Sequence, residues 1–279
     1  MPEGDTIHRT AGRLRPALVG ADLVRFAAPR LLGDRPVPGT RISDVEAVGK
    51  HLLIHFDGGL SLQTHMRMTG SWHLYRSGER WRKAPHLARA IVEVDGWVAV
   101  CFNAPVVRTY RRDAPGGPLG TARHPTAHLG PDLCGTDVAE ADIDECVRRM
   151  GIYAGDDPIG VALLDQRVAC GVGNVYKSET LFACGIDPFV TVTDLDEPDR
   201  RRLLAMSSKL LRANLGNGPR TTLPGGLAVY GRHRQPCRRC GTLICMRRQG
   251  EQARSTYWCP TCQPPHGTAP HVGLSAPHP

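Results

Sequence analysis

The chain has 279 residues, of which 41% are hydrophobic, and a net charge of +8. This length exceeds what one small core needs and predicts two compact domains with an appendage. No stretch approaches the roughly 20 apolar residues of a membrane span, and the first residues are too polar for a secretory signal, so we expect a soluble, cytoplasmic protein.

The first predicted element is a helix. Asp5 is a candidate N-cap, and four apolar residues then follow at helical spacing on one face, namely Ile7, Ala11, Leu14 and Leu18. Pro16 is expected to kink or shorten the last turn before Gly20. The dipeptide in front of this helix, Pro2-Glu3, is either a frayed terminus or a reactive group that removal of Met1 exposes.

Strand patterns follow from about residue 23 to residue 102. HLLIHF and LSLQTH flank Asp57-Gly58-Gly59, and LARAIVEV and WVAVCF flank Asp95-Gly96. Short apolar runs separated by Asp-Gly pairs are typical of β-hairpins. Several such strands joined by turns predict a sandwich or a barrel.

The pattern changes in the second half of the chain. A Gly, Pro and His rich stretch predicts a linker, and helical spacing then returns around residues 143–150, 159–164, 175–184 and 194–215. We expect an N-terminal domain over 1–118, a linker over 119–136, a helical domain over 137–222, a metal-binding hairpin over 223–263 and a disordered tail over 264–279.

The positive charge is concentrated near the C-terminal end. Residues 200–263 hold thirteen Lys or Arg and one acidic residue, Glu251, so this segment has a net charge of +12 and the remainder −4. A solvated surface is the simplest interpretation, but clustering of this degree is more typical of a face that binds phosphates. The charge therefore predicts a phosphate-bearing partner.

Four of the ten cysteines form a metal-binding pattern. Two C-x2-C pairs are separated by eighteen residues, and they comprise Cys237, Cys240, Cys259 and Cys262. This spacing is typical of a structural zinc site, with an Fe-S cluster or free thiols as alternatives. Four protein ligands leave no position for an activated water, so we expect one Zn²⁺ that stabilises a basic hairpin. The cysteines that stand singly are interpreted as buried thiols.

A Gly-rich junction lies between two of the predicted helices. Gly171, Gly173 and Asn174 follow one helix and begin the next. They predict either a tight turn with Asn174 as N-cap, or a phosphate site made by unobstructed backbone N–H groups at a helix N-terminus. The basic hairpin downstream favours the phosphate site.

Together these motifs resemble one family. MPEG, VGKHLL, LLDQRVACGVGNVYKSE and VYGRHRQPCRRCG…RSTYWCPTCQ occur in the order found in the formamidopyrimidine-DNA glycosylase and endonuclease VIII family. The resemblance implies an α+β fold with an N-terminal β-sandwich preceded by a helix, a helix-two-turn-helix domain and a C-terminal zinc-finger β-hairpin. It also implies a bifunctional DNA glycosylase and abasic-site (AP) lyase that acts in base excision repair.

The resemblance also assigns roles to single residues. It implies that Pro2 is the nucleophile, that Glu3 assists catalysis, that Lys50 belongs to the catalytic site, and that Asn174 and Arg254 bind DNA phosphates. Without the resemblance, a solvated role for Lys50 and Arg254 is at least as well supported.

A further DNA contact is expected in the stretch THMRMTG. An enzyme that acts on a damaged base must turn the base out of the duplex and fill the space left behind. The resemblance places Met68 in that space and Arg67 against the unpaired strand, whereas a role for Met68 in the core is the alternative. The expected partner is damaged double-stranded DNA, with single-stranded DNA left open, and we expect a monomer.

Two departures from the family pattern bear on the substrate. The Arg-Phe wedge of the purine-repair branch is missing from CFNAPVVRTYRR, and Thr6 replaces an acidic residue. These departures favour oxidised pyrimidines over oxidised purines. Two alternatives stay open, an oxidised-purine glycosylase of the same family and a non-catalytic, zinc-dependent DNA- or RNA-binding protein.

Overall fold

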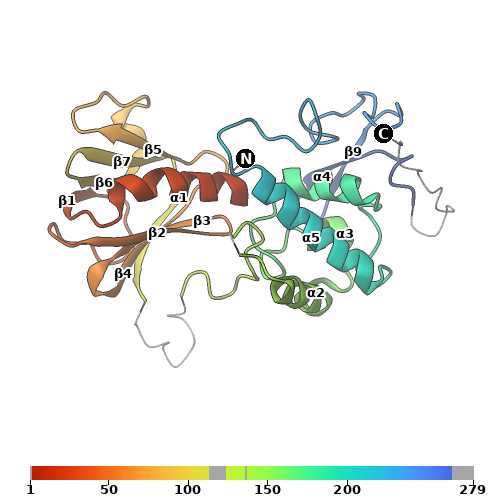
Figure 1. The fold of residues 1–279 in the computed structure, drawn as a ribbon, viewed down its shortest axis with the longest axis horizontal. Helices are drawn as coiled ribbons and strands as arrows, with labels where there is room; N and C mark the ends of the chain where they lie inside the picture. The colour runs from red at the N-terminus through yellow and green to blue at the C-terminus, as the bar shows by residue number, and fades with distance from the viewer. Residues whose placement is uncertain (1, 113–123, 136, 266–279) are drawn as a thin grey trace.

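The structure, a computed structural model, describes residues 2–112, 124–135 and 137–265. Two bodies lie side by side along the long axis, with α1 and the larger sheets at one end and helices with a short hairpin at the other (Figure 1). This arrangement confirms the predicted α+β class, in which a β-sandwich, a helical domain and a C-terminal hairpin follow one another.

The N-terminal part is a sandwich of two antiparallel sheets. Apolar residues from both sheets and from α1 form one core, as the alternating pattern in the sequence requires. One sheet has the order β1-β6-β7-β5 and contains Leu23–Ala27, Ala88–Val94, Trp97–Phe102 and Ser71–Arg76. The other has the order β2-β3-β4-β8 and contains Ile42–Val48, His51–Phe56, Leu60–His65 and Val106–Arg111.

Both predicted hairpins are present. β6 pairs with β7 across Asp95-Gly96, and β3 pairs with β4 across the short 3-10 turn Asp57–Gly59. Gly58 and Gly96 both have positive φ angles, which glycine adopts without a steric penalty.

Helix α1 spans Gly4–Leu18 and packs its predicted apolar face into the sandwich core. The prediction that Asp5 caps this helix is wrong, because Glu3 occupies the N-cap position and Asp5 lies buried within the first turn. Pro16 does not end the helix, which continues to Leu18.

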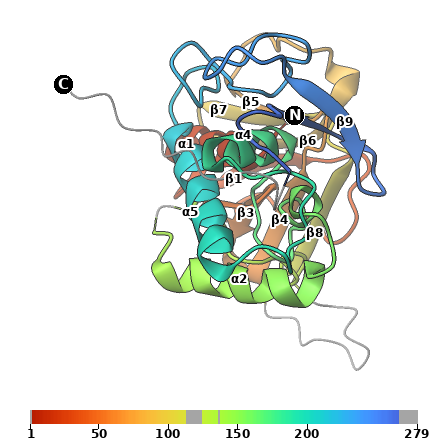
Figure 2. The same ribbon diagram turned by 90° about the vertical axis from the view of Figure 1, so that its right-hand side faces the viewer.

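The C-terminal part, as far as the structure describes it, consists of four helices and a two-stranded hairpin. The helices are α2 (Glu140–Ala154), α3 (Ile159–Ala162), α4 (Asn174–Cys184) and α5 (Glu197–Ala213), and the strands are β9 (Cys245–Gln249) and β10 (Arg254–Trp258). Gly185 ends α4 in the left-handed conformation, and Asp196 caps α5 through its side chain. In Figure 2, which faces this end, the hairpin lies above α4 and α2 runs below.

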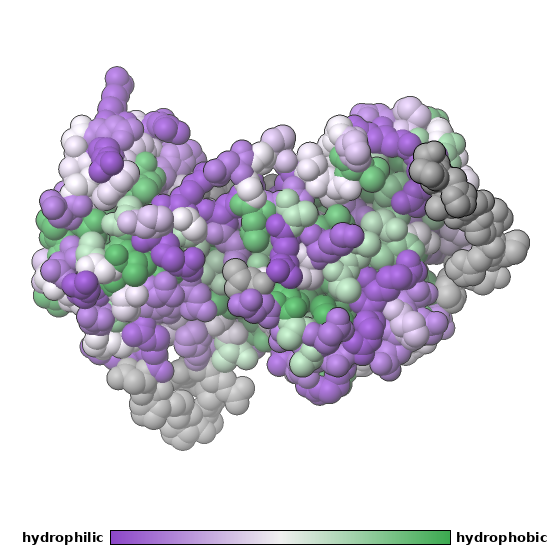
Figure 3. Space-filling model, in the orientation of Figure 1, coloured by the Kyte–Doolittle hydropathy of each residue, from purple (hydrophilic) through white to green (hydrophobic). Residues whose placement is uncertain are grey.

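The predicted boundaries at residues 118, 136, 222 and 263 stay predictions. Residues 119–123 and 136 of the predicted linker and nearly all of the predicted tail lie outside the described residues. Within the described residues, no helix is long and apolar enough to cross a membrane. The face drawn in Figure 3 is mostly hydrophilic, with apolar residues in scattered patches.

Candidate active site at the domain junction

Glu3 is fully buried where the two parts meet, at the start of α4. Its carboxylate accepts hydrogen bonds from the backbone N–H groups of Gly173, Val175 and Tyr176 at 3.1, 2.9 and 3.3 Å. The first N–H groups of a helix have no partner within it and carry the positive end of its dipole. Glu3 therefore ties the segment before α1 to the N-terminus of α4.

Glycines allow this close approach. A Cβ atom on Gly173 would lie 2.3 Å from Cδ of Glu3, so a larger residue would displace the carboxylate. The N–H of Gly4 donates to the carbonyl of Gly171 at 2.9 Å, and a Cβ on Gly4 would lie 2.9 Å from Cα of Gly171. The N–H groups of this junction were predicted to hold a phosphate, but Glu3 and Gln166 occupy those of Gly171, Gly173, Val175 and Tyr176.

Glu3 and Lys50, which is partly buried, lie close enough for each to influence the pKa of the other. Lys50 lies in the turn between β2 and β3, and burial lowers its pKa to about 8, with Glu3 opposing the shift and Arg254 adding to it. Burial raises the pKa of Glu3, while Arg220, Lys50 and the backbone hydrogen bonds oppose that shift. The environment thus raises the pKa of Glu3 and lowers that of Lys50, as is common for groups that exchange protons at a functional site. Pro2, which is partly exposed, directly precedes Glu3.

Asp132 holds the backbone around Glu3 and Lys50 in place. Asp132 accepts from the N–H groups of Gly49 and Cys134 at 2.7 and 2.9 Å and contacts Nε2 of His8 at 2.9 Å. It therefore joins α1, the turn before Lys50 and the entry to the helical part.

Asp5 forms a bidentate pair with Arg220, whose Nε and Nη2 atoms donate at 2.6 and 2.5 Å. Arg220 also donates to Oγ1 of Thr6 at 2.8 Å. This buried pair brings the positive charge of Arg220 close to Glu3, which is why Arg220 is the strongest of the influences that lower the pKa of Glu3.

Helix α4 is joined to the hairpin through Ser255. Nδ2 of Asn174 donates to the carbonyl of Ser255 at 2.8 Å, and Nζ of Lys177 donates to the same carbonyl at 3.1 Å and to Oγ1 of Thr256 at 2.7 Å. Lys177 is fully buried, and burial lowers its pKa to about 7. The N-cap of α4 is Gly173, so the alternative role of Asn174 as N-cap is wrong. Oδ1 of Asn174 is buried and has no hydrogen-bond partner among the described residues, which is rare for a buried polar atom.

Arg254 begins β10, next to Ser255. Its Nε and Nη2 atoms donate to Oε1 of Gln252 at 3.1 and 2.8 Å. Its charge contributes to lowering the pKa of both Lys50 and Lys177. The structure thus brings together Glu3, Lys50, Asn174 and Arg254, which come from four distant segments of the chain.

A second buried glutamate supports the base of the hairpin. The carboxylate of Glu179 accepts from the N–H groups of Ala228, Val229 and Tyr230 at 2.7, 2.9 and 2.7 Å, and from the hydroxyl of Thr222. Because Glu179 lies on α4, this contact fixes the chain that leads into the hairpin relative to that helix.

Met68 and Arg67 lie in the exposed loop between β4 and β5. Met68 is 63% exposed, so the alternative that placed it in the core is wrong. Arg67 has a φ of 44°, an uncommon conformation for a residue with a side chain. His65, just before the loop, has its pKa lowered to about 4 by burial, by Lys50 and by Arg67, so it is neutral at pH 7 and links the loop to the Lys50 site.

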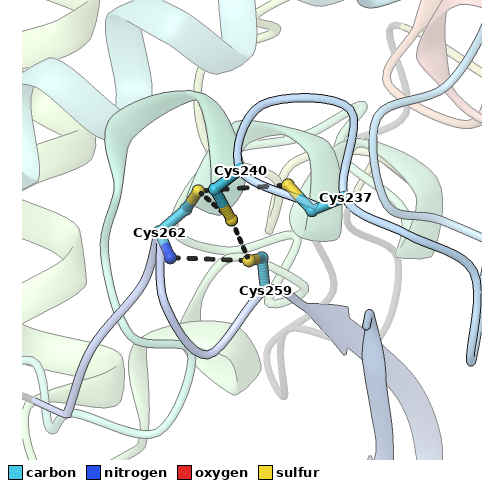
Figure 4. A group of neighbouring side chains, drawn as sticks. All are labelled: Cys237, Cys240, Cys259 and Cys262. Atoms are coloured by element: carbon cyan, nitrogen blue, oxygen red, sulfur yellow. Dashed lines mark hydrogen bonds between the residues drawn. The ribbon is translucent and has the colours of Figure 1, made fainter. Parts of the chain in front are cut away.

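The four cysteines of the two C-x2-C pairs form one cluster (Figure 4). Their Sγ atoms all lie within 4.8 Å of one another, close enough for one metal ion to contact all four. The five cysteines predicted to be structural thiols are buried, and these are Cys101, Cys134, Cys146, Cys170 and Cys184.

Comparison with known proteins decides the family. The model of the formamidopyrimidine-DNA glycosylase N-terminal domain matches residues 1–106, and that of the formamidopyrimidine-DNA glycosylase H2TH domain matches residues 129–223. The chain belongs to the formamidopyrimidine-DNA glycosylase family. The resemblance predicted from the sequence is thereby confirmed.

Relatives in this family match along nearly their whole length. The chain is 41% identical to a protein of Streptomyces coelicolor named "Probable endonuclease 8 2", over 98% of this chain and 97% of that protein. It is 38% identical to "DNA-(apurinic or apyrimidinic site) lyase Nei2" of Mycolicibacterium smegmatis, over 94% and 99%. The crystal structure of the MutM (Fpg) protein from Thermus thermophilus superimposes with a TM-score of 0.72 at 31% identity, over 94% and 98%.

Proposed function

We propose how single residues carry out a reaction whose class follows from the family. The chain is a DNA glycosylase with abasic-site lyase activity, an enzyme of base excision repair. The observation that carries the proposal is the position of Glu3, which is buried against the N-terminus of α4 and Lys50 and directly follows Pro2.

Pro2 is the proposed nucleophile. Once Met1 is removed, its secondary amine titrates as an α-amino group, at about pH 7.7 to 8.0, so a useful fraction is unprotonated near neutrality. The positive end of the α1 dipole lowers that pKa further. Attack on C1′ of the deoxyribose forms a C–N bond and breaks the bond to the damaged base, which leaves with the glycosidic electron pair and a proton.

Glu3 moves protons during this step, and Lys50 assists at the same site. After the amine proton is lost, the lone pair of the Pro2 nitrogen expels O4′, which takes up a proton as the sugar ring opens. The product is a positively charged iminium between Pro2 and C1′, which withdraws electrons from the sugar. Elimination of the 3′ phosphate and then of the 5′ phosphate follows, and water finally releases the enzyme. The expected product is a one-nucleotide gap.

Asn174 and Arg254 are the proposed phosphate contacts. Phosphate contacts fix the register of the duplex while the base is turned out of the stack. The amide oxygen of Asn174, which lacks a partner among the described residues, supports this role, because the side chain has not reached its full set of hydrogen bonds in the free protein. Met68 is proposed to fill the space left by the base, with Arg67 beside it. Its exposure supports that role.

One structural Zn²⁺ is the proposed occupant of the cysteine cluster. Zn–S distances of about 2.3 Å in a tetrahedron place the sulfur atoms about 3.8 Å apart. The Sγ atoms of Cys237 and Cys262 lie 3.9 Å apart, those of Cys240 and Cys259 3.4 Å, and those of Cys240 and Cys262 3.5 Å. The zinc would hold the hairpin that carries Arg254.

Cys259→Ser tests the role of the metal. We expect it to lose zinc and DNA binding while the sandwich stays folded, which metal analysis and circular dichroism would measure. Full strand cleavage by metal-free Cys259→Ser protein would contradict this role.

Oxidised pyrimidines in duplex DNA are the proposed substrate. The missing Arg-Phe wedge in residues 101–112 and Thr6 support pyrimidines over purines. A panel of lesion-containing oligonucleotides, single-stranded and double-stranded, assayed for strand cleavage distinguishes these substrates. The proposed enzyme acts as a cytoplasmic monomer.

Borohydride reduction tests the nucleophile, because it converts the iminium into a stable protein–DNA bond. We expect the wild-type protein to be trapped on a duplex with an abasic site and Pro2→Gly to be trapped far less. The same assay distinguishes an enzyme from a non-catalytic zinc protein, which would bind the duplex without being trapped. Undiminished trapping of a protein that retains Met1 would point to another amine, with Lys50 the first to test.

A further inference from the structure

A second cluster of positive charge lies outside the basic C-terminal segment. Residues 76–89 contain five Lys or Arg and one acidic residue, Glu79, whereas the chain outside residues 200–263 has a net charge of −4. This segment connects β5 to β6 in the sandwich and includes the short 3-10 turn Pro85–Leu87. It plays no part in the proposed catalytic site.

The register of the sheet places one end of this segment next to the Met68 loop. Ser71 and Ala88 both pair with Phe102, so the start of β5, the start of β6 and the end of β7 lie in one row. The N–H of Asn103 donates to the carbonyl of Leu87 at 2.9 Å, and Oγ1 of Thr69 donates to the carbonyl of Asn103 at 3.2 Å. The segment therefore ends at the same edge of the sandwich as the loop that carries Met68.

An aromatic anchor fixes the segment on the sheet. The ring of Trp81 packs edge-on against Phe102, with centroids 5.8 Å apart, and stacks with Tyr75 at 6.3 Å. The N–H of Arg82 donates to the hydroxyl of Tyr75 at 3.1 Å, and Nζ of Lys83 donates to Oγ of Ser71 at 2.9 Å. The side chain of Lys83 and the backbone of Arg82 are therefore held in place, and groups that are already ordered lose less conformational entropy when they bind a partner.

The cations at this anchor differ from other basic residues of the sandwich. Arg82 and Lys83 both lie close enough to His73 to lower its pKa, together with burial. Within the described part of the chain, neither Arg82 nor Lys83 forms an ion pair with a carboxylate. Other arginines of the sandwich do, since Arg25 pairs with Glu93 at 2.7 Å and Arg111 with Asp34 at 3.4 Å.

We propose that Arg82 and Lys83 form a second phosphate-binding surface. This surface contacts the DNA backbone next to the space in the duplex that Met68 is proposed to fill. This inference rests on the proposed function, because it assumes a duplex at the Met68 loop. The phosphates of DNA would supply the negative charge that no carboxylate supplies to Arg82 and Lys83 within the described residues. The surface also adjoins the Met68 loop, which is proposed to enter the duplex.

Salt dependence of binding tests this surface. Each phosphate contact releases counterions, so log Kobs falls with log[salt] by a slope of about 0.9 per contact. We compare the wild-type protein with Arg82→Met plus Lys83→Met, which removes the charges and keeps the apolar stems, on a duplex with an uncleavable abasic analogue. We expect the slope to become shallower by about 1 to 2 units and the affinity near 0.1 M salt to fall roughly tenfold.

Arg25→Met is the matched control, because it removes an exposed arginine that already has a carboxylate partner. It is expected to leave slope and affinity unchanged. A double variant that keeps the wild-type slope and affinity would overturn the inference, as would an equal effect of Arg25→Met.

Borohydride trapping separates this inference from the proposed function. If the wild-type protein is not trapped on an abasic duplex, the proposed function fails. If it is trapped while the double variant keeps the wild-type slope, only the second surface is wrong. At saturating protein, the double variant is expected to be trapped as fully as the wild type, because Pro2 and Glu3 are unchanged.

Discussion

Two buried glutamates connect α4 to other parts of the chain by the same means, one at its N-terminus and one at its middle. Glu3 accepts three backbone N–H groups at the start of the helix, and Glu179, on the helix itself, accepts three from the chain that leads into the hairpin. Their surroundings differ, because Glu3 lies beside Pro2 and Lys50 whereas Glu179 contacts backbone and the hydroxyl of Thr222. Burial and hydrogen bonding alone therefore do not mark a catalytic carboxylate.

The largest expected effect is on the rate of base removal, and it comes from comparing Glu3→Gln with Glu179→Gln. Both changes place an NH2 group opposite backbone N–H donors, so both should destabilise the fold. Only Glu3→Gln is expected to slow base removal, by about 10² to 10⁴-fold, because it removes a group that moves protons. The rate of base release under single-turnover conditions measures this. An equal loss in Glu179→Gln would break the comparison and leave Glu3 with a structural role.

Gly173→Ala sharpens the comparison without removing a functional group. A Cβ atom there would lie 2.3 Å from Cδ of Glu3, so the carboxylate must shift. A misplacement of about 1 Å can cost on the order of 10²-fold in rate, which is the expected loss in base removal. Gly216→Ala is the control, since a Cβ on Gly216 meets nothing within 4 Å. A Gly173→Ala enzyme with full activity would show that the observed Glu3 position is not required.

Removing the carboxylate of Glu179 should act on stability instead. Glu179→Ala leaves three backbone N–H groups and the Thr222 hydroxyl without their carboxylate partner. Each buried unsatisfied group costs about 1 to 3 kcal/mol, so we expect unfolding to require at least about 3 kcal/mol less. Denaturant titration measures the change, and Thr222→Val, which removes one of the four donors, should cost less. Equal losses would contradict the central role of Glu179.

The last expected effect is the pH dependence of stability that Lys177 creates. Its pKa is about 7 in the folded protein and about 10.4 when exposed in the unfolded chain, so the unfolded state binds more protons between these values. Stability should therefore rise from about pH 7 to about pH 10, by at most about 1.4 kcal/mol per pH unit. Lys177→Met should flatten this rise, whereas exposed Lys209→Met should not. An unchanged rise in Lys177→Met would assign it to another group.

The sequence predicted best those features whose residues lie close together in the chain. Both C-x2-C pairs stand within one short segment, and the hairpins around Asp57-Gly58-Gly59 and Asp95-Gly96 depend on adjacent residues. Their spacing alone therefore indicated a metal site and a β-rich domain. The family resemblance added Pro2, Glu3 and Lys50, whose roles stay predictions.

Sequence patterns missed the residues whose partners are distant. Asp5 satisfied the local rule for an N-cap, but its partner Arg220 lies 215 positions away and draws it into a buried pair. Lys177 stands in a helix that contains both polar and apolar residues, and it resembles a solvated lysine until Ser255 and Thr256 are placed beside it. Polar residues stand beside both Lys177 and Glu179 in α4, so the helix sequence alone does not indicate that these two charged side chains are buried.

The contact between Glu3 and α4 also sets an order of events during synthesis. Glu3 and Val175 are separated by 172 positions, so a ribosome that adds roughly 5 to 20 residues per second makes Val175 about 10 to 35 s after Glu3. Until then Glu3 has no amides of α4 to bind, and the N-terminus stays accessible to the peptidase that would expose Pro2 for its proposed role. Once α4 docks, Gly4 and Glu3 are held against Gly171 and Gly173. Slower translation would therefore lengthen the interval in which the N-terminus can be processed before Glu3 is held in place.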